Sequence, residues 1–139
     1  MRASIALCSV TTELARLVAF AEAFAGDCGF ADDERSRLLI ILEELFTNVV
    51  AHGSAQNVAA ALGLSRGRLT IDFVDDGPPF DPLTHPGVDL DAPGEERPIG
   101  GLGIAIVRAL VDKARYRRQG SRNHLRLARR IVLAAKDRR

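Results

Sequence analysis

The strongest helical pattern in the chain covers residues 32–53, where Asp32 or Asp33 is suited to cap the helix and Gly53 to end it. Its apolar residues recur at steps of three and four, the spacing of one helical face: Leu38, Ile41, Leu42, Leu45 and Val49. Glu44, Asn48 and His52 follow one another at steps of four and stack in a second row. The pattern predicts a core-facing helix with three polar side chains in line beside its buried face.

Shorter patterns predict two further helices and five strands. We expect a strand at 4–10, suited to a sheet edge, and a helix from Thr11 or Thr12 to about Cys28. Strands at 57–64 and 69–74 are joined by Ser-Arg-Gly as a hairpin. A helix at 105–111 and strands at 114–119 and 123–127 follow, and residues 131–135 either extend the last strand or begin a short helix. This order indicates a single α+β domain over residues 1–139, with a mixed, mostly antiparallel sheet of about five strands on about three helices.

One segment breaks these patterns. All six prolines lie between Pro78 and Pro98, and seven acidic residues but no Lys or Arg occur from Asp75 to Glu96. Prolines at this density exclude regular elements, and a long irregular loop inside a compact domain is usually functional. We therefore expect a functional loop at about 78–100.

Composition restricts the class of protein. With 139 residues, 47% hydrophobic, and no apolar run long enough to span a membrane, the chain is typical of a globular domain. Two cysteines without metal-type spacing, and no signal peptide, indicate a cytoplasmic protein. Ten basic residues lie between Arg115 and Arg139, but Tyr116 is the one aromatic residue there, so direct nucleic-acid binding is not expected. A solvated strand face is the favoured explanation, and an acidic protein partner is the alternative.

Several residues have side chains suited to nucleotide chemistry. Glu44 can act as a general base, and Asn48 offers a neutral oxygen to Mg²⁺ when a nucleotide supplies the other ligands. The acceptor-only carboxylate of Asp75, at a strand end, suits an exocyclic amine such as that of adenine. Each also has an ordinary structural explanation, as part of a solvated helix face or a tight turn.

Glycines precede the last predicted helix. Gly100, Gly101 and Gly103 allow a phosphate to approach the backbone at a helix N-terminus, although they serve packing equally well. They form neither a Walker A loop nor a dinucleotide-binding fingerprint. Arg97 either neutralises the preceding acids or reaches a phosphate.

Together these motifs resemble a known family. Glu44-x-x-x-Asn48, Asp75-x-Gly77, the long loop and the final Gly-x-Gly occur in the order of the N box, first glycine box, ATP lid and second glycine box of the Bergerat ATP-binding fold. Residues 44–53, 97–104 and 110–118 most resemble the anti-sigma-factor serine kinases, and the resemblance extends over about 10–127.

The resemblance implies roles for individual residues. Glu44 would activate the attacking hydroxyl, Asn48 would bind Mg²⁺, and Asp75 with Gly77 would bind the adenine of ATP. The segment from Gly101 through Leu102 and Gly103 to Ile104 would wrap the phosphates, with Arg97 nearby. The last strand departs from the family pattern, because Ser121 precedes Arg122-Asn123 and Arg126 replaces a threonine. What this strand adds to the adenine side is therefore left open.

The implied activity is that of a cytoplasmic, ATP- and Mg²⁺-dependent serine protein kinase. Its substrate would be a serine of an anti-anti-sigma partner of the STAS type, and relatives also sequester a sigma factor. Neither a membrane nor nucleic acid is an expected partner, and an exposed first strand is compatible with a homodimer. Two alternatives stay open: a non-catalytic ATP-binding switch that holds a protein partner, and the detached ATP-binding domain of a two-component histidine kinase. The second is disfavoured by the lack of room for a phospho-acceptor helix pair before Ser4.

Overall fold

The structure of the protein is a computed structural model that describes residues 1–52, 54–84 and 101–133. Its elements, in chain order, are β1 (Arg2–Cys8), a 3-10 turn η1 (Thr11–Glu13), α1 (Leu14–Cys28), α2 (Asp32–His52), β2 (Asn57–Ser65), β3 (Arg68–Asp75), α3 (Gly101–Leu110), β4 (Lys113–Gln119) and β5 (Arg122–Arg130). None of the helices in these ranges is long and apolar enough to cross a membrane.

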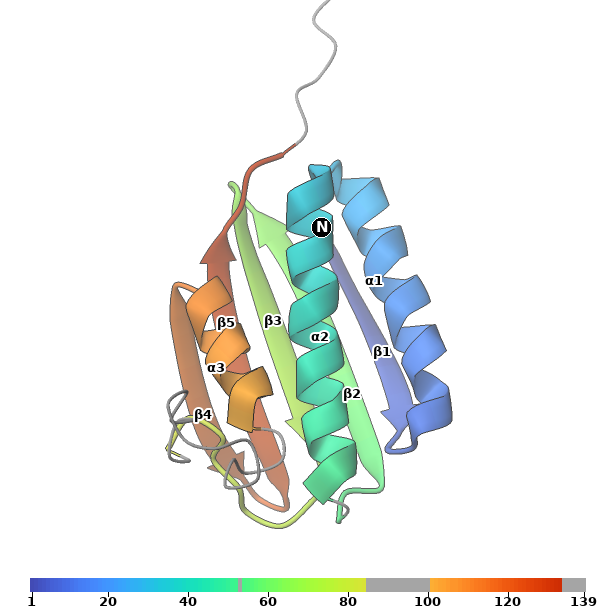
Figure 1. Ribbon diagram of the computed structural model, residues 1–139, viewed down its shortest axis with the longest axis vertical. Coiled ribbons are helices and arrows are strands. Elements are labelled where there is room, and N and C mark those ends of the chain that lie inside the picture. The colour runs from blue at the N-terminus through green and yellow to red at the C-terminus, as the bar shows by residue number, and fades with distance from the viewer. Residues whose placement is uncertain (53, 85–100, 134–139) are drawn as a thin grey trace, which may run out of the picture.

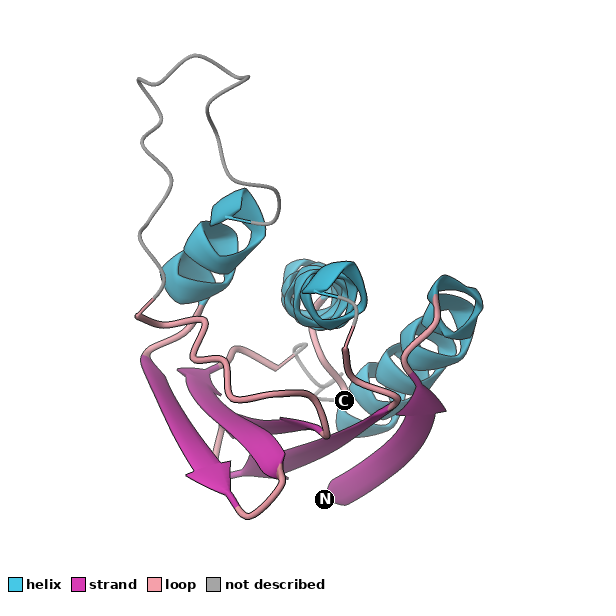
Figure 2. Ribbon diagram, turned by 90° about the horizontal axis from the view of Figure 1, so that it is seen from below, coloured by secondary structure: helices cyan, strands magenta, loops and turns pink. Residues whose placement is uncertain are grey.

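The five strands form one sheet in the order β1-β2-β3-β5-β4. The four pairings between the described strands are all antiparallel, so the sheet is less mixed than expected. All three helices cover the same face, with α2 between α1 and α3 (Figures 1 and 2). The α+β prediction of two layers is confirmed, and β1 lies at an edge as expected.

Helix α2 forms the centre of the core. Leu38, Ile41, Leu42 and Leu45 are each at most 2% exposed, and Val49 is half-buried against the same cluster. These positions are the apolar stripe predicted from the sequence, and they pack on buried side chains of the sheet. The stripe fixes the rotation of α2 about its axis, and with it the direction of the polar row.

The hairpin between β2 and β3 is as predicted. Its two turn residues, Arg66 and Gly67, have φ values of 53° and 73°, which is the combination of a type I′ turn. The pairing then runs from Ser65 opposite Arg68 to Val58 opposite Asp75. This register places Asp75, at the end of β3, next to the start of β2 and therefore close to the segment that connects α2 to β2.

Several element ends differ from the predictions. β1 begins at Arg2 and ends at Cys8, because its pairing with β2 sets its limits. Neither Thr11 nor Thr12 caps α1: a 3-10 turn comes first, and the N-cap residue of α1, Glu13, makes no side-chain capping hydrogen bond. α3 begins at Gly101, four residues before the predicted start. The glycines in its first turn lower the helix propensity but do not prevent the helix from forming. β5 continues to Arg130, and Leu133 forms an isolated bridge with Phe30.

The opposite face of the sheet carries none of the described helices (Figure 2). In β4 the alternate residues Lys113, Arg115 and Arg117 are exposed, and Arg126 of β5 pairs with Arg115. On this face Asp72 forms an ion pair with Arg126 at 3.7 Å. Four basic side chains of the described residues, Lys113, Arg115, Arg117 and Arg126, therefore lie exposed on the uncovered side of the sheet.

Candidate functional site

A cavity of about 230 Å³ opens between the C-terminal half of α2, the end of β3 and the start of β5. Three residues expected to bind ATP or Mg²⁺, Asn48, Asp75 and Gly77, line this cavity, together with His52 of the polar row. Its wall is otherwise largely apolar, with Val49 and Phe80 among the lining residues. An apolar cavity with a few polar groups is typical of a small-molecule site.

Asp75 is held in place by two hydrogen bonds to one of its oxygens. The backbone N–H of Gly77 donates to Oδ1 at 2.9 Å, and Nδ2 of Asn123 donates to the same atom at 3.0 Å. Among the described residues, none donates to Oδ2. The carboxylate therefore keeps one oxygen as an acceptor for a ligand in the cavity that it lines.

Gly77 is required by close packing at the same corner. A Cβ atom there would lie 3.0 Å from Asp75 Oδ1 and 3.3 Å from the Cβ of Ala55. Any side chain at this position would push on the carboxylate or on the opposite wall of the cavity. The Asp-x-Gly spacing is therefore more than a turn, because the glycine leaves room for the aspartate.

Asn123 connects the strands beneath the cavity and was not predicted as a site residue. It is 6% exposed, and its Nδ2 donates to Asp75 and to the carbonyl of Pro78 at 2.8 Å. Its Oδ1 accepts from the Tyr116 hydroxyl at 2.6 Å and from the Phe80 N–H at 3.1 Å. The side-chain amide thus fixes both the carboxylate and the loop that follows it. The last strand therefore contributes a side chain that orients Asp75.

Arg118 of β4 stabilises the Asp75-x-Gly77 segment, the first glycine box, through hydrogen bonds. Its Nη1 donates to the carbonyl of Gly77 at 2.7 Å and to Asn123 Oδ1 at 3.2 Å. Its Nε donates to the carbonyl of Gly120 in the β4–β5 turn. The edge strand therefore contributes to the geometry of the site even though it does not line the cavity.

Asp76 anchors the other wall of the cavity. Its Oδ1 accepts from the N–H groups of Gln56 at 2.7 Å and Asn57 at 2.9 Å, and its Oδ2 accepts from Asn57 Nδ2 at 2.8 Å. The backbone N–H and side-chain amide of Asn57, followed by the N–H of Gln56, lower the pKa of Asp76 to about 2 from 3.8. Asp76 thus ties the end of β3 to the segment after α2.

Replacing Asp76 with Asn is expected to lower the free energy of unfolding by about 1 to 2 kcal/mol at pH 7. Folding lowers the pKa of the Asp76 carboxyl below 3.8, so the extra free energy of unfolding of the wild type is fully present above that pH. It is lost as the pH falls from about 4 towards about 2, where the carboxylate becomes protonated in the folded state too. Urea unfolding of both proteins between pH 7 and pH 3 measures this difference. An advantage that is already gone at pH 5 would contradict the assignment.

The polar row of α2 runs from the cavity towards α3. His52, at the rim, stacks on Phe80 with ring centroids 4.5 Å apart and planes at 38°. Asn48 lines the cavity one turn earlier. Glu44, one further turn along, is half-buried and lies against Gly103 of α3. The row is therefore part of the site, and His52 has a packing role within it.

Gly103 and Glu44 are in unusually close contact. A Cβ atom on Gly103 would overlap Glu44 Oε2 and lie 3.2 Å from its Cδ. Gly103 is buried in the first turn of α3, where the helix dipole and the free N–H groups favour negative charge. The second glycine box thus lets the start of α3 approach a carboxylate and any anion bound beside it.

Of the other residues predicted to bind the nucleotide, those at the start of α3 belong to the described part of the chain and Arg97 does not. Gly101 and Leu102 begin α3, and Ile104 is half-buried against the core. Arg97 lies outside the described residues. Ile104 therefore anchors the helix start rather than lining the cavity.

Mg²⁺ fits this site only together with a nucleotide. Among the described residues, no group of three or more His, Cys, Asp or Glu side chains could hold a metal ion. Asn48 offers a single neutral oxygen, and Mg²⁺ at nucleotide sites is commonly held by one or two protein ligands with phosphates and waters.

Comparison with known proteins gives a consistent result. Residues 9–129 match the family described as the histidine kinase-like ATPase domain. The chain is 33% identical over 95 residues to a protein of Bacillus thuringiensis named serine-protein kinase RsbW. That alignment covers 63% of this chain and 59% of the relative, so the chain spans less than two thirds of that protein.

Two solved structures share the fold. The RsbU and RsbW domains of a Mycobacterium tuberculosis protein match with a TM-score of 0.67 and 18% identity, covering 98% of this chain and 34% of that one. The Acinetobacter baumannii histidine kinase AdeS matches with a TM-score of 0.51 and 18% identity, covering 93% and 68%. At these identities the likeness concerns the fold.

Proposed function

The chain belongs to the histidine kinase-like ATPase domain family, and from this premise we propose that it is an ATP- and Mg²⁺-dependent serine protein kinase. The observation that carries the proposal is the order of three side chains along one path. Asp75 stands at the cavity, Asn48 lies at its wall on α2, and Glu44 lies one turn further on, under the start of α3. In this order, the three side chains would lie beside the adenine, the Mg²⁺ ion and the reacting phosphate of a bound ATP.

The base would be bound at the cavity end. Oδ2 of Asp75, to which none of the described residues donates, would accept from the exocyclic amine of adenine, and the apolar wall would pack on the ring. Asn123 and Gly77 keep Asp75 in the orientation for this contact. A guanine, which has a carbonyl group at the corresponding position, would face the carboxylate unfavourably.

The phosphates would lie between α2 and α3. The first turn of α3, with Gly101 and Gly103, supplies N–H groups and a partial positive charge. Asn48 would hold Mg²⁺ together with the phosphates, and the bound metal would supply neutralisation of the charge that develops during transfer. Glu44 would orient a serine hydroxyl and accept its proton while the hydroxyl oxygen attacks the γ-phosphorus and ADP leaves.

The protein substrate is proposed from relatives. Proteins named serine-protein kinase RsbW match this chain at 33% identity, and the sequence motifs resemble anti-sigma-factor kinases. We therefore propose a serine of a STAS-type anti-anti-sigma protein as the acceptor and a sigma factor as a second partner, with both encounters in the cytoplasm.

Incubation with γ-labelled ATP, Mg²⁺ and purified STAS-domain proteins of the same source tests the proposal. Label on a serine of one STAS protein, dependent on Mg²⁺, is the expected result. Nucleotide-dependent binding without label would instead support a non-catalytic switch. Absence of both would reject the proposal.

Replacing Gly103 with Ala is expected to lower phosphoryl transfer by about 10- to 100-fold, because the methyl group displaces the Glu44 carboxylate. Stability should change little, since alanine favours helix and the displaced group is the end of a flexible side chain. Gly26→Ala in α1 is the matched control, because a Cβ there meets no atom within 4 Å. Transfer rates and thermal unfolding midpoints of both variants check the prediction, and equal transfer by both would contradict it.

A further inference from the structure

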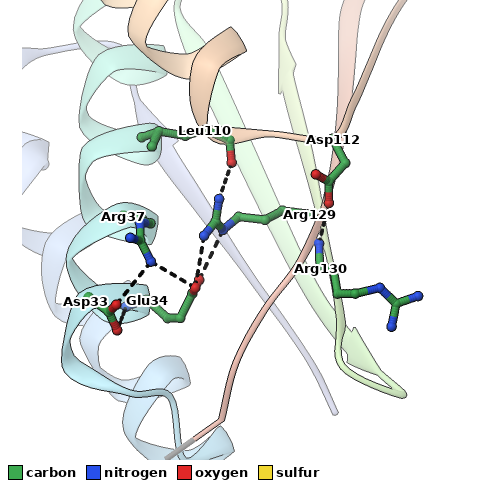
Figure 3. A network of polar contacts seen from close by, with 7 residues as sticks. All are labelled: Asp33, Glu34, Arg37, Leu110, Asp112, Arg129 and Arg130. Carbon is green, nitrogen blue, oxygen red and sulfur yellow. Dashed lines mark hydrogen bonds and ion pairs between the residues drawn. The ribbon is translucent and has the colours of Figure 1, made fainter.

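The start of α2 contains a buried carboxylate that the nucleotide site does not use. Glu34 is 4% exposed. Arg129 of β5 donates to both of its oxygens, from Nε to Oε2 at 3.1 Å and from Nη2 to Oε1 at 2.9 Å (Figure 3). A two-point contact of this kind fixes the relative orientation of both groups.

The third nitrogen of the same guanidinium reaches another helix. Nη1 of Arg129 donates to the carbonyl of Leu110, the last residue of α3, at 2.6 Å (Figure 3). Carbonyl groups at a helix C-terminus lack partners within the helix and carry partial negative charge, so a cation there is favourable. Arg129 therefore joins the start of α2, the end of α3 and strand β5.

The chain that leaves α3 is fastened to the same strand. The N–H of Asp112 donates to the carbonyl of Ala128 at 2.9 Å, and the N–H of Arg130 donates to Asp112 Oδ2 at 2.6 Å. The C-terminal end of α3 is thus held from two sides. Its N-terminal end carries Gly103, which lies against Glu44.

Helices α2 and α3 are therefore connected near both ends of α3. Gly103 lies against Glu44 at one end, and Arg129 joins Leu110 to Glu34 at the other. α3 has ten residues and is about 15 Å long, and Glu34 lies ten residues before Glu44 on α2, also about 15 Å away. A helix this short moves as a rod, so a shift at Leu110 moves Gly103 as well. A methyl group on Gly103 would overlap the end of the Glu44 side chain, so the placement of α3 decides where that carboxylate can lie.

We propose that Arg129 is a positioning residue for the phosphoryl-transfer site: through Glu34 and Leu110 it sets the placement of α3 that brings Gly103 and the helix N-terminus over Glu44. This inference rests on the proposed kinase function. A buried ion pair adds little net stability compared with apolar side chains of similar volume. Apolar side chains cannot reproduce the hydrogen bonds by which Arg129 of β5 contacts Glu34 of α2 and Leu110 of α3 at the same time.

The test separates positioning from stability. Glu34→Met combined with Arg129→Met removes the buried carboxylate and its half-buried partner and keeps the volume, so the unfolding midpoint should stay close to that of the wild type. Because the Leu110 contact is lost, kcat for transfer should fall by about 10- to 100-fold, with a change in the KM for ATP of less than about threefold. Arg129→Lys, which keeps the charge but replaces the forked guanidinium with a single ammonium nitrogen, should recover part of kcat.

Arg37→Met is the matched control. Arg37 also donates to Glu34 Oε1, at 3.0 Å, but it comes from α2 itself and makes no described contact with α3. Its removal should leave kcat within about twofold of the wild type. A double variant that transfers phosphate at the wild-type rate would overturn the inference.

A second measurement does not depend on kinase activity. Amide hydrogen exchange of residues 103–107 in the nucleotide-free protein should be faster in the double variant, while exchange in α1 and β2 stays unchanged. If the wild type transfers no phosphate to any acceptor, the proposed function fails, and the exchange rates alone decide the inference. Unchanged exchange at 103–107 would then overturn it.

Discussion

Replacing Glu44 with Gln is expected to reduce phosphoryl transfer by about 10²- to 10⁴-fold while ATP binding is largely retained. The amide keeps the size of the side chain and can still fill the space against Gly103, but it cannot accept the proton of a serine hydroxyl. Glu44 is half-buried and does not line the adenine cavity, so the affinity for nucleotide should change little. Single-turnover transfer from γ-labelled ATP and calorimetric titration with ATP measure the two effects separately.

Glu43→Gln is the control for that experiment. It makes the same chemical change one residue earlier on α2, where the side chain points away from the row formed by Glu44 and Asn48. Transfer by this variant should match the wild type. Transfer at the wild-type rate by Glu44→Gln would show that a different group handles the proton.

Replacing Asp75 with Asn is expected to weaken ATP binding by about 2 to 3 kcal/mol, which is about 30- to 150-fold in the dissociation constant. The two donors from Gly77 and Asn123 both point at Oδ1, so the new amide must keep its oxygen there. Its NH₂ group then faces the cavity, where it meets the NH₂ group of adenine. Titration with ATP, ADP and GTP checks the prediction, and relative affinity should shift towards GTP, whose carbonyl group accepts from the new donor.

Asp72→Asn provides the matched comparison. Asp72 lies on the same strand but on the uncovered face of the sheet, where its Oδ1 is 2.9 Å from His124 Nε2. Nucleotide affinity should be unchanged in this variant. Equal losses in both variants would show that the charge on β3, rather than its position at the cavity, governs binding.

The part of the site that follows local sequence patterns could be predicted. The apolar stripe of α2 fixes where Glu44 and Asn48 point, and the hydrogen bond from the Gly77 N–H to Asp75 lies within the Asp-x-Gly segment itself. The family match confirms the resemblance based on these boxes. The sequence alone therefore identified the fold and four residues that line the cavity, Asn48, His52, Asp75 and Gly77.

The residues that support the site could not be predicted in this way. Asn123 meets Asp75 across 48 positions and Arg129 meets Glu34 across 95, so both contacts depend on strand register and helix placement. In the sequence, Arg129 is one of ten basic residues near the C-terminus, with nothing to separate it from solvent-exposed neighbours. The same reason explains the limits of β1, which its pairing with β2 decides.

The uncovered face of the sheet has an electrostatic consequence. Lys113, Arg115, Arg117 and Arg126 gather there, although the chain as a whole has a net charge of only +1. A cluster of like charges gives this face a positive potential even when the net charge of the chain is near zero. The protein should therefore be retained on a cation-exchange resin near its isoelectric point, with the sheet face towards the matrix and the helices towards solution.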